Sequence, residues 1–182
     1  MKRKLLVGAL LVLGIPLLVV ILSFRASTLE VTEEVPIALS KPPKVEGVRL
    51  SAIYAGRMES VGAFAYRGGS FGDKRIFGMG AILVRHPSGN LLFDTGFGKN
   101  VDEHVRKMPW LMRTTTQYTA ERTVADQLAA ANFPLGDIAR IVLTHAHWDH
   151  VSGLQDLPDV QIMTSREEAD FIDSDDPAAA LV

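Results

Sequence analysis

The chain has 182 residues, of which 47% are hydrophobic and 22% are charged, and its formal net charge at pH 7 is -2. This composition predicts an ordinary globular domain with one additional apolar segment. A small negative charge leaves no basic surface of the kind that binds nucleic acid, so no nucleic-acid partner is expected. The chain has no cysteine, which excludes disulfides and thiolate-bound zinc, and any transition metal must be held by nitrogen and oxygen ligands.

The N-terminus combines a basic start with a long apolar run. Lys2, Arg3 and Lys4 precede residues 5–24, which carry no charge and could span about 30 Å of hydrocarbon at about 1.5 Å per residue. Residues 1–25 are therefore predicted to be a transmembrane anchor, with a cleaved signal segment as the alternative. The positive-inside bias then places the rest of the chain outside the cytoplasm, membrane-anchored or exported.

The next segment, residues 26–47, contains three prolines and no sustained hydrophobic period. It is predicted to be a linker, and residues 48–182 are predicted to form the folded domain. Stretches rich in β-branched and aromatic residues predict three strands, at 48–55, 78–85 and 90–93. The last two strands are expected to form a hairpin, and the glycine-rich stretch 67–73 a loop.

The second half of this domain alternates helix and strand patterns. Residues 121–132 place apolar side chains on one helical face, with Thr119 as the expected N-cap. An apolar strand at 138–143, a short strand at 160–163 and a helix from Ser165 follow. This order predicts an α/β layered domain.

Three of the five histidines fall within one six-residue run that directly follows the predicted strand at 138–143, namely His145-Ala146-His147-Trp148-Asp149-His150. His145 and His147 point to the same side if the chain is extended, and a turn can bring Asp149 and His150 to the same cavity. Imidazole and carboxylate donors together suit zinc, manganese or iron better than calcium or magnesium. Because several polar groups at the end of an apolar strand are costly to bury without compensation, we predict a metal site here.

The two histidines outside the run, and the tryptophan within it, can be explained without a bound metal. A lone histidine such as His86 or His104 more often satisfies hydrogen bonds in the fold than it binds an ion. Trp148 is expected to pack as a lid or wall beside the site.

The histidine run resembles the metallo-β-lactamase superfamily, as does an earlier stretch, Leu92-Phe93-Asp94-Thr95-Gly96. The resemblance implies an αββα four-layer sandwich with a metal site at one edge. It further implies that His145 and His147 bind a first zinc ion and that Asp149 and His150 bind a second. Asp94 would support the loop that carries these ligands.

The chemistry implied by this resemblance is hydrolysis. A water bridging two metal ions is acidified and attacks a carbonyl or phosphoryl centre, and Asp149 passes a proton to the leaving group. The expected substrate is a small molecule, with a lactone or other carboxylic ester ahead of an amide, a thioester or a phosphoester.

Members of this family also supply a further histidine, a bridging aspartate and a last histidine downstream of the first motif. Residues 151–182 contain no histidine. We therefore expect only the N-terminal half of the sandwich in residues 48–182, and an inactive, truncated metal-binding fragment is an alternative function.

Two further alternatives remain open. Asp94-Thr95-Gly96 also matches the catalytic triplet of aspartic proteases, which would require a dimer because the chain has one such triplet. The second alternative keeps the fold but uses iron to oxidise a thiol-derived substrate.

Overall fold

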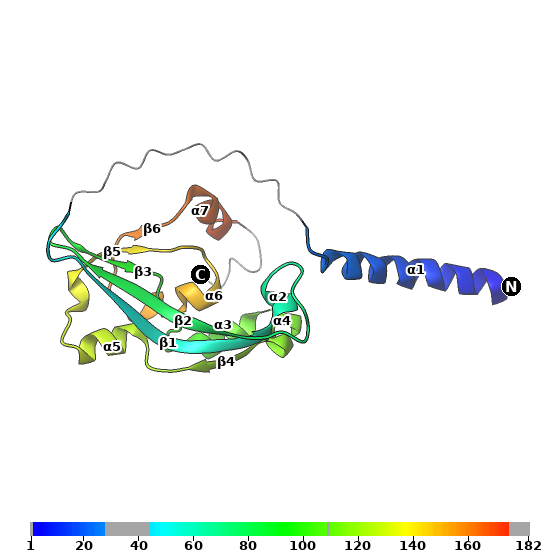
Figure 1. Cartoon of the computed structure of the whole chain (residues 1–182), viewed down its shortest axis with the longest axis horizontal. Helices are drawn as coiled ribbons and strands as arrows, with labels where there is room; N and C mark the ends of the chain where they lie inside the picture. The colour runs from blue at the N-terminus through cyan, green and yellow to red at the C-terminus, as the bar shows by residue number, and fades with distance from the viewer. Residues whose placement is uncertain (1, 28–43, 109, 175–182) are drawn as a thin grey trace. The chain divides into compact units, whose positions relative to one another are not determined.

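The computed structural model describes residues 2–27, 44–108 and 110–174 (Figure 1). Most of the predicted linker, residues 28–43, lies outside this described part. The described residues divide into two compact units, one within Met1–Ser40 and Ser60–Arg75 and the other within Lys41–Glu59 and Ile76–Val182.

The first unit contains helix α1 (Lys2–Ser23) and the short helix α2 (Gly62–Ala65). Phe24 packs against Phe64 and Phe71, with ring centroids 6.2 and 5.4 Å away. None of the helices among the described residues is long and apolar enough to cross a membrane. The transmembrane anchor and its alternative, a cleaved signal segment, stay predictions.

The second unit is organised by a mixed six-stranded sheet with the order β4-β1-β2-β3-β5-β6. The strands are β1 (Arg49–Val61), β2 (Lys74–Arg85), β3 (Asn90–Phe93), β4 (Gln117–Ala120), β5 (Ile138–Val142) and β6 (Ile162–Met163). Strands β2 and β3 form the predicted antiparallel hairpin, in which Leu83 lies opposite Leu92. Strand β5 runs parallel to both β3 and β6, so these three strands end at the same edge of the sheet.

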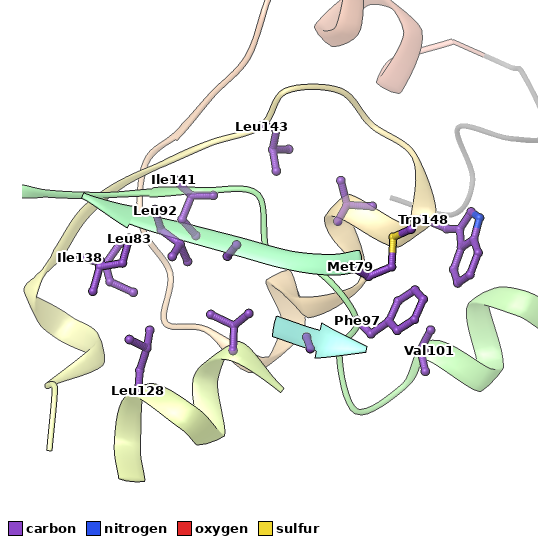
Figure 2. Close-up of a cluster of buried hydrophobic side chains, with 14 of the residues drawn as sticks. Met79, Leu83, Leu92, Phe97, Val101, Leu128, Ile138, Ile141, Leu143 and Trp148 are labelled. Carbon is purple, nitrogen blue, oxygen red and sulfur yellow. The ribbon is translucent and has the colours of Figure 1, made fainter. Parts of the chain in front are cut away.

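Short helices connect the strands and cover the core. They are α3 (Val101–Lys107), α4 (Trp110–Thr115), α5 (Val124–Ala130), η1 (Leu135–Asp137), α6 (Trp148–Val151), η2 (Ser152–Asp156) and α7 (Arg166–Ile172). Figure 2 shows apolar side chains of the strands facing those of α3, α5 and α6. Leu92 and Ile141 are at most 1% exposed, and this burial of apolar area stabilises the unit that carries the candidate site.

The prediction of a helix at residues 121–132 was wrong at its start, because the observed helix α5 begins at Val124. Thr119, the expected N-cap, lies in β4 opposite Arg57, because pairing with β1 extends the chain there. The N-cap of α5 is Thr123, whose hydroxyl accepts a hydrogen bond of 3.1 Å from the Asp126 amide. Helix α7, by contrast, was predicted to start at Ser165, and it begins at Arg166 with Ser165 as its N-cap.

Candidate metal centre

The histidine run leaves β5 as an extended loop and enters α6. His147 has extended backbone angles (φ -76°, ψ 148°) and is the N-cap of α6, so Asp149 and His150 lie in the first turn of that helix. The chain therefore turns between the first two predicted ligands, His145 and His147, and the last two, Asp149 and His150.

Trp148 anchors α6 in the core and is no lid. Its ring is 6% exposed and stacks on Phe97 at a centroid distance of 5.2 Å, while Tyr118 packs edge-on against both. The Tyr118 hydroxyl donates to Asp102 at 2.7 Å, and burial together with this carboxylate raises the pKa of Tyr118 to about 12. These aromatic contacts thus fix Trp148, the residue that directly precedes the predicted ligand Asp149.

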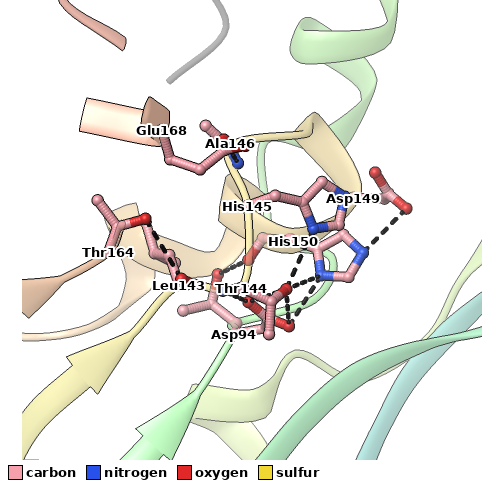
Figure 3. A network of polar contacts seen from close by, with 10 residues as sticks. Asp94, Leu143, Thr144, His145, Ala146, Asp149, His150, Thr164 and Glu168 are labelled. Carbon is pink, nitrogen blue, oxygen red and sulfur yellow. Dashed lines mark hydrogen bonds and ion pairs between the residues drawn. The ribbon is translucent and has the colours of Figure 1, made fainter. Parts of the chain in front are cut away.

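Asp94 connects the end of β3 to the histidine run. Its backbone has a φ of +56°, a left-handed conformation in which aspartate is one of the better-tolerated side chains. Its carboxylate accepts hydrogen bonds from the Thr144 amide at 2.8 Å, the Thr144 hydroxyl at 2.8 Å and His150 Nδ1 at 2.9 Å (Figure 3). These contacts connect Asp94 to the loop that carries the predicted ligands.

The rest of the Asp-Thr-Gly triplet lies against α6 and η2. The amide and hydroxyl of Thr95 both donate to the His150 carbonyl, at 2.9 and 2.7 Å, and the Gly153 amide donates to Gly96 at 3.1 Å. A Cβ atom on Gly153 would lie 2.5 Å from the Thr95 carbonyl oxygen, so the two backbones touch. Because the triplet is engaged with the histidine run, the aspartic-protease alternative loses its basis.

The three histidine rings of the run are neighbours. The His145 ring centroid is 4.0 Å from that of His150 and 4.5 Å from that of His147. His150 Nε2 is 3.5 Å from an Asp149 carboxylate oxygen. Within the parts of the chain that the structure describes, however, no three histidine, aspartate or glutamate side chains are arranged to hold one ion.

Charge in the cluster favours a metal-binding protonation state for His145. Its pKa is lowered by burial and by the neighbouring His150 and His147, so the neutral imidazole, which is the ligand form, predominates at neutral pH. For His150, burial opposes protonation, but the Asp94 hydrogen bond and the Asp149 and Asp94 charges outweigh it and raise the pKa. The pKa of Asp94 is lowered, because contacts with His150 and Thr144 outweigh the effect of burial.

The donors fit the metal that the histidine run predicts. Two ligands about 2.1 Å from a tetrahedral zinc ion lie about 3.4 Å apart, close to the observed separation between His150 Nε2 and Asp149. The carboxylate on His150 Nδ1 is the usual partner of a metal-binding imidazole. Asp149 and His150 Nε2, called the half-site below, are thus spaced as two ligands of one ion would be, and the His145 ring lies beside His150.

An apolar cavity of about 680 Å³ lies beside this half-site. Its walls come from β1, β2 and β3, including Leu50, Tyr54 and Ile82, and its polar lining includes Asp149 and His150. The cavity places an apolar surface next to the predicted metal ligands.

The isolated histidines occupy other positions. His86 Nδ1 accepts a hydrogen bond of 3.0 Å from the Ser88 amide in the β2–β3 turn. His104 is 5% exposed in α3, with Nε2 3.3 Å from the Gln155 side-chain nitrogen. His86 has the kind of structural contact that was predicted, whereas the Nδ1 atom of His104 is buried without a hydrogen-bond partner among the described residues.

Pattern reading missed two residues that contact the run, Thr144 and Glu168. Thr144 directly precedes His145, so its position was visible while its contact with Asp94 was not. Glu168 accepts a hydrogen bond of 2.8 Å from the Ala146 amide. Its only sequence signal was the spacing Ser165-x-x-Glu168, which is typical of a helix start.

Comparison with known families identifies the lineage of this fold. The sequence profile described as the metallo-beta-lactamase superfamily matches residues 81–173, about half of the chain. The chain belongs to the metallo-β-lactamase superfamily. The matched region contains both Asp94 and the histidine run, as the resemblance of these motifs predicted.

The chain is similar to two curated proteins described as probable metallo-hydrolases, one of Mycobacterium tuberculosis and one of Mycobacterium bovis. Each is 29% identical over 97 residues, which cover 48% of this chain and 29% of the relative. The chain thus spans under a third of the length of these relatives.

Solved structures agree on the fold. A B. thuringiensis AiiA variant with N-decanoyl-L-homoserine bound at its active site has a TM-score of 0.61 at 18% identity, over 71% of this chain and 53% of that one. An N-acyl homoserine lactone hydrolase with its product bound at the catalytic metal centre has the same TM-score at 17% identity, over 71% and 53% of the two chains.

Proposed function

We propose that this chain carries the first metal-binding motif of a zinc-dependent hydrolase that acts on a small-molecule ester or lactone. The observation that carries the proposal is the pairing of Asp149 with His150 Nε2 while Asp94 holds His150 Nδ1. The family membership and the named metallo-hydrolase relatives support hydrolysis.

Each residue of the motif has a proposed task. His145 and His147 hold one ion, and Asp149 and His150 hold the second. Asp94 keeps a proton on His150 Nδ1, so that Nε2 presents its lone pair to the metal. Bound zinc supplies an acidified water and stabilises the oxyanion that develops on the substrate. Asp149 also accepts the proton of the attacking water and donates it to the leaving oxygen.

Two of the solved structures with this fold support the choice of substrate class. Homoserine derivatives are bound in those two proteins, and an acylated lactone is therefore the first substrate to test.

The six-stranded sheet supports a sandwich architecture. Leu50, Tyr54 and Ile82 are 44–72% exposed and line the same apolar cavity. We infer that a second sheet covers this face, which would complete the αββα arrangement and supply further metal ligands. The proposed location outside the cytoplasm stays a prediction.

Metal analysis combined with a substrate panel tests the function. Protein purified without added metal is expected to contain zinc in preference to iron or manganese, and a chelator is expected to abolish any lactone hydrolysis. Because the described donors offer no complete three-ligand group, turnover by the 182-residue chain is expected to be slow. Iron as the main bound metal, together with oxygen consumption on a thiol substrate, would instead favour the oxidative alternative.

A further inference from the structure

Two carboxylates from outside the loop hold the backbone of the histidine run. The Thr144 amide donates to Asp94 at 2.8 Å, and the Ala146 amide donates to Glu168 Oε2 at 2.8 Å (Figure 3). Asp94 arrives from the end of β3, whereas Glu168 arrives from α7 on the other side of the loop. The predicted ligands His145 and His147 flank the second of these contacts directly.

The topology brings Glu168 to this position. Strands β5 and β6 run parallel, so the loop after β5 and the helix after β6 begin at the same edge of the sheet. The Leu143 amide donates to the Met163 carbonyl at 2.8 Å, and the Thr164 hydroxyl donates to the Leu143 carbonyl at 3.3 Å. The start of α7 is thus attached to the strand that leads into His145.

Glu168 departs from the usual role of a glutamate at this helix position. In a capping box the N-cap hydroxyl accepts from the third amide of the helix, and the glutamate there returns to the N-cap amide. Ser165 makes the first of these contacts, since its hydroxyl accepts from the Glu168 amide at 3.2 Å. The Glu168 carboxylate instead accepts from Ala146, so its side chain serves the loop.

Burial makes this contact consequential. Ala146 is 2% exposed, so water has little access to replace the carboxylate as a hydrogen-bond acceptor. A buried amide without a partner is costly, and hydrogen bonds to charged groups are stronger than neutral ones. Loss of Glu168 is therefore expected to reorient the peptide group between His145 and Ala146.

We propose that Glu168 is a positioning residue of the metal centre. Its carboxylate fixes the peptide that joins His145 to Ala146, and thereby the directions in which the His145 and His147 imidazoles leave the backbone. The inference rests on the proposed function, because the value of this orientation lies in metal binding. Glu168 itself needs no contact with the ion.

The test compares Glu168→Ala and Glu168→Gln with Glu167→Ala, a control at the preceding, exposed position of α7. Hydrogen exchange of the Ala146 amide is measured by NMR in the metal-free full chain. Exchange is expected to become at least about tenfold faster in Glu168→Ala. Glu168→Gln keeps an acceptor oxygen and should restore most of the protection, and Glu167→Ala should match wild type.

Zinc affinity, measured by calorimetry on the same proteins, is the second readout. Glu168→Ala is expected to bind zinc about tenfold more weakly than wild type, with Glu168→Gln between the two. Unchanged Ala146 exchange in Glu168→Ala, or equal acceleration in Glu167→Ala, would overturn the positioning role. Equal zinc affinity of wild type and Glu168→Ala would also overturn it, whereas a wild-type chain that binds no zinc would overturn the proposed function.

Discussion

Asp94 shows how one side chain ties two motifs together. Its left-handed backbone turns the carboxylate toward the loop after β5, where three donors from Thr144 and His150 converge on it. Asparagine tolerates the same backbone, so a substitution can remove the negative charge while keeping the local geometry.

Asp94→Asn is accordingly expected to weaken zinc binding by about 10- to 100-fold, because the amide no longer orients and polarises His150 as a carboxylate does. Calorimetric titration with zinc measures the effect. Asp170→Asn, at an exposed position of α7, is the matched control and should bind like wild type. Equal affinity of the two variants would contradict the role assigned to Asp94.

His104 offers a prediction about pH. Its pKa is lowered below 6.5 in the folded chain, because burial and the nearby Lys107 disfavour the charged imidazole. The folded state therefore binds fewer protons than the unfolded state, so the stability from neutral His104 is present above pH 6.5 and is lost as the pH falls through the lowered pKa.

Urea unfolding at several pH values from about 7 down to about 4 checks this sign, because this range extends from above the ordinary histidine pKa of about 6.5 to well below it. The free energy of unfolding should decrease more steeply with falling pH in wild type than in His104→Leu, which has no group to protonate at this position. Parallel curves for the two proteins would show that His104 does not contribute.

Among the helices and strands, α6 is the element whose position depends most clearly on one side chain, that of Trp148. Trp148 packs with Phe97 and Tyr118, and the next two residues are the predicted ligands Asp149 and His150. Any change that loosens the tryptophan therefore affects both core packing and the candidate site.

Trp148→Ala is expected to lower the free energy of unfolding by about 3–5 kcal/mol, the usual cost of removing a buried aromatic ring. Trp110→Ala is the control, because Trp110 is 69% exposed and its loss should cost within about 0.5 kcal/mol. Chemical denaturation followed by circular dichroism measures both. Similar losses in the two variants would mean that the stack does not hold α6.

The elements also show which features were predictable from sequence. Strand β3 and the β2–β3 hairpin have strong local signals, in apolar alternation and in the turn His86-Pro87-Ser88-Gly89. Strand β4 does not, since its four residues become a strand by pairing with β1, and Thr119 was consequently misassigned. Local sequence carries the pattern of an element, whereas edge pairing depends on distant residues.

The same distinction holds in the site. The run from His145 to His150 was visible because the ligands are close in sequence, and Asp94 was found through its family motif. Glu168 is 22 residues from Ala146, and its contact depends on the parallel pairing of β5 with β6. No local pattern specifies that pairing.

At the scale of the whole molecule, the sheet face that carries Ile82 is exposed among the described residues and has a consequence in solution. Ile82 and Ile162 are equally exposed at 48%, but only Ile82 lines the apolar cavity with Leu50 and Tyr54. Contiguous apolar surface promotes association, whereas single exposed apolar residues are ordinary.

The full chain is therefore expected to self-associate at micromolar concentration, and Ile82→Lys should reduce this association. Ile162→Lys should leave it nearly unchanged. Analytical ultracentrifugation of the three proteins distinguishes these outcomes. A monomeric wild type, or an equal effect of both lysines, would argue against association through this face.

The contact between Gly153 and Thr95 also divides the site into parts with different tolerance for variation. With no room for a Cβ atom between the two backbones, a randomised library should recover folded members only when position 153 remains glycine. Exposed positions without such backbone contact, such as Glu167, should accept many side chains. Sequence variation would then accumulate at such positions while the frame around the predicted metal ligands stays constant.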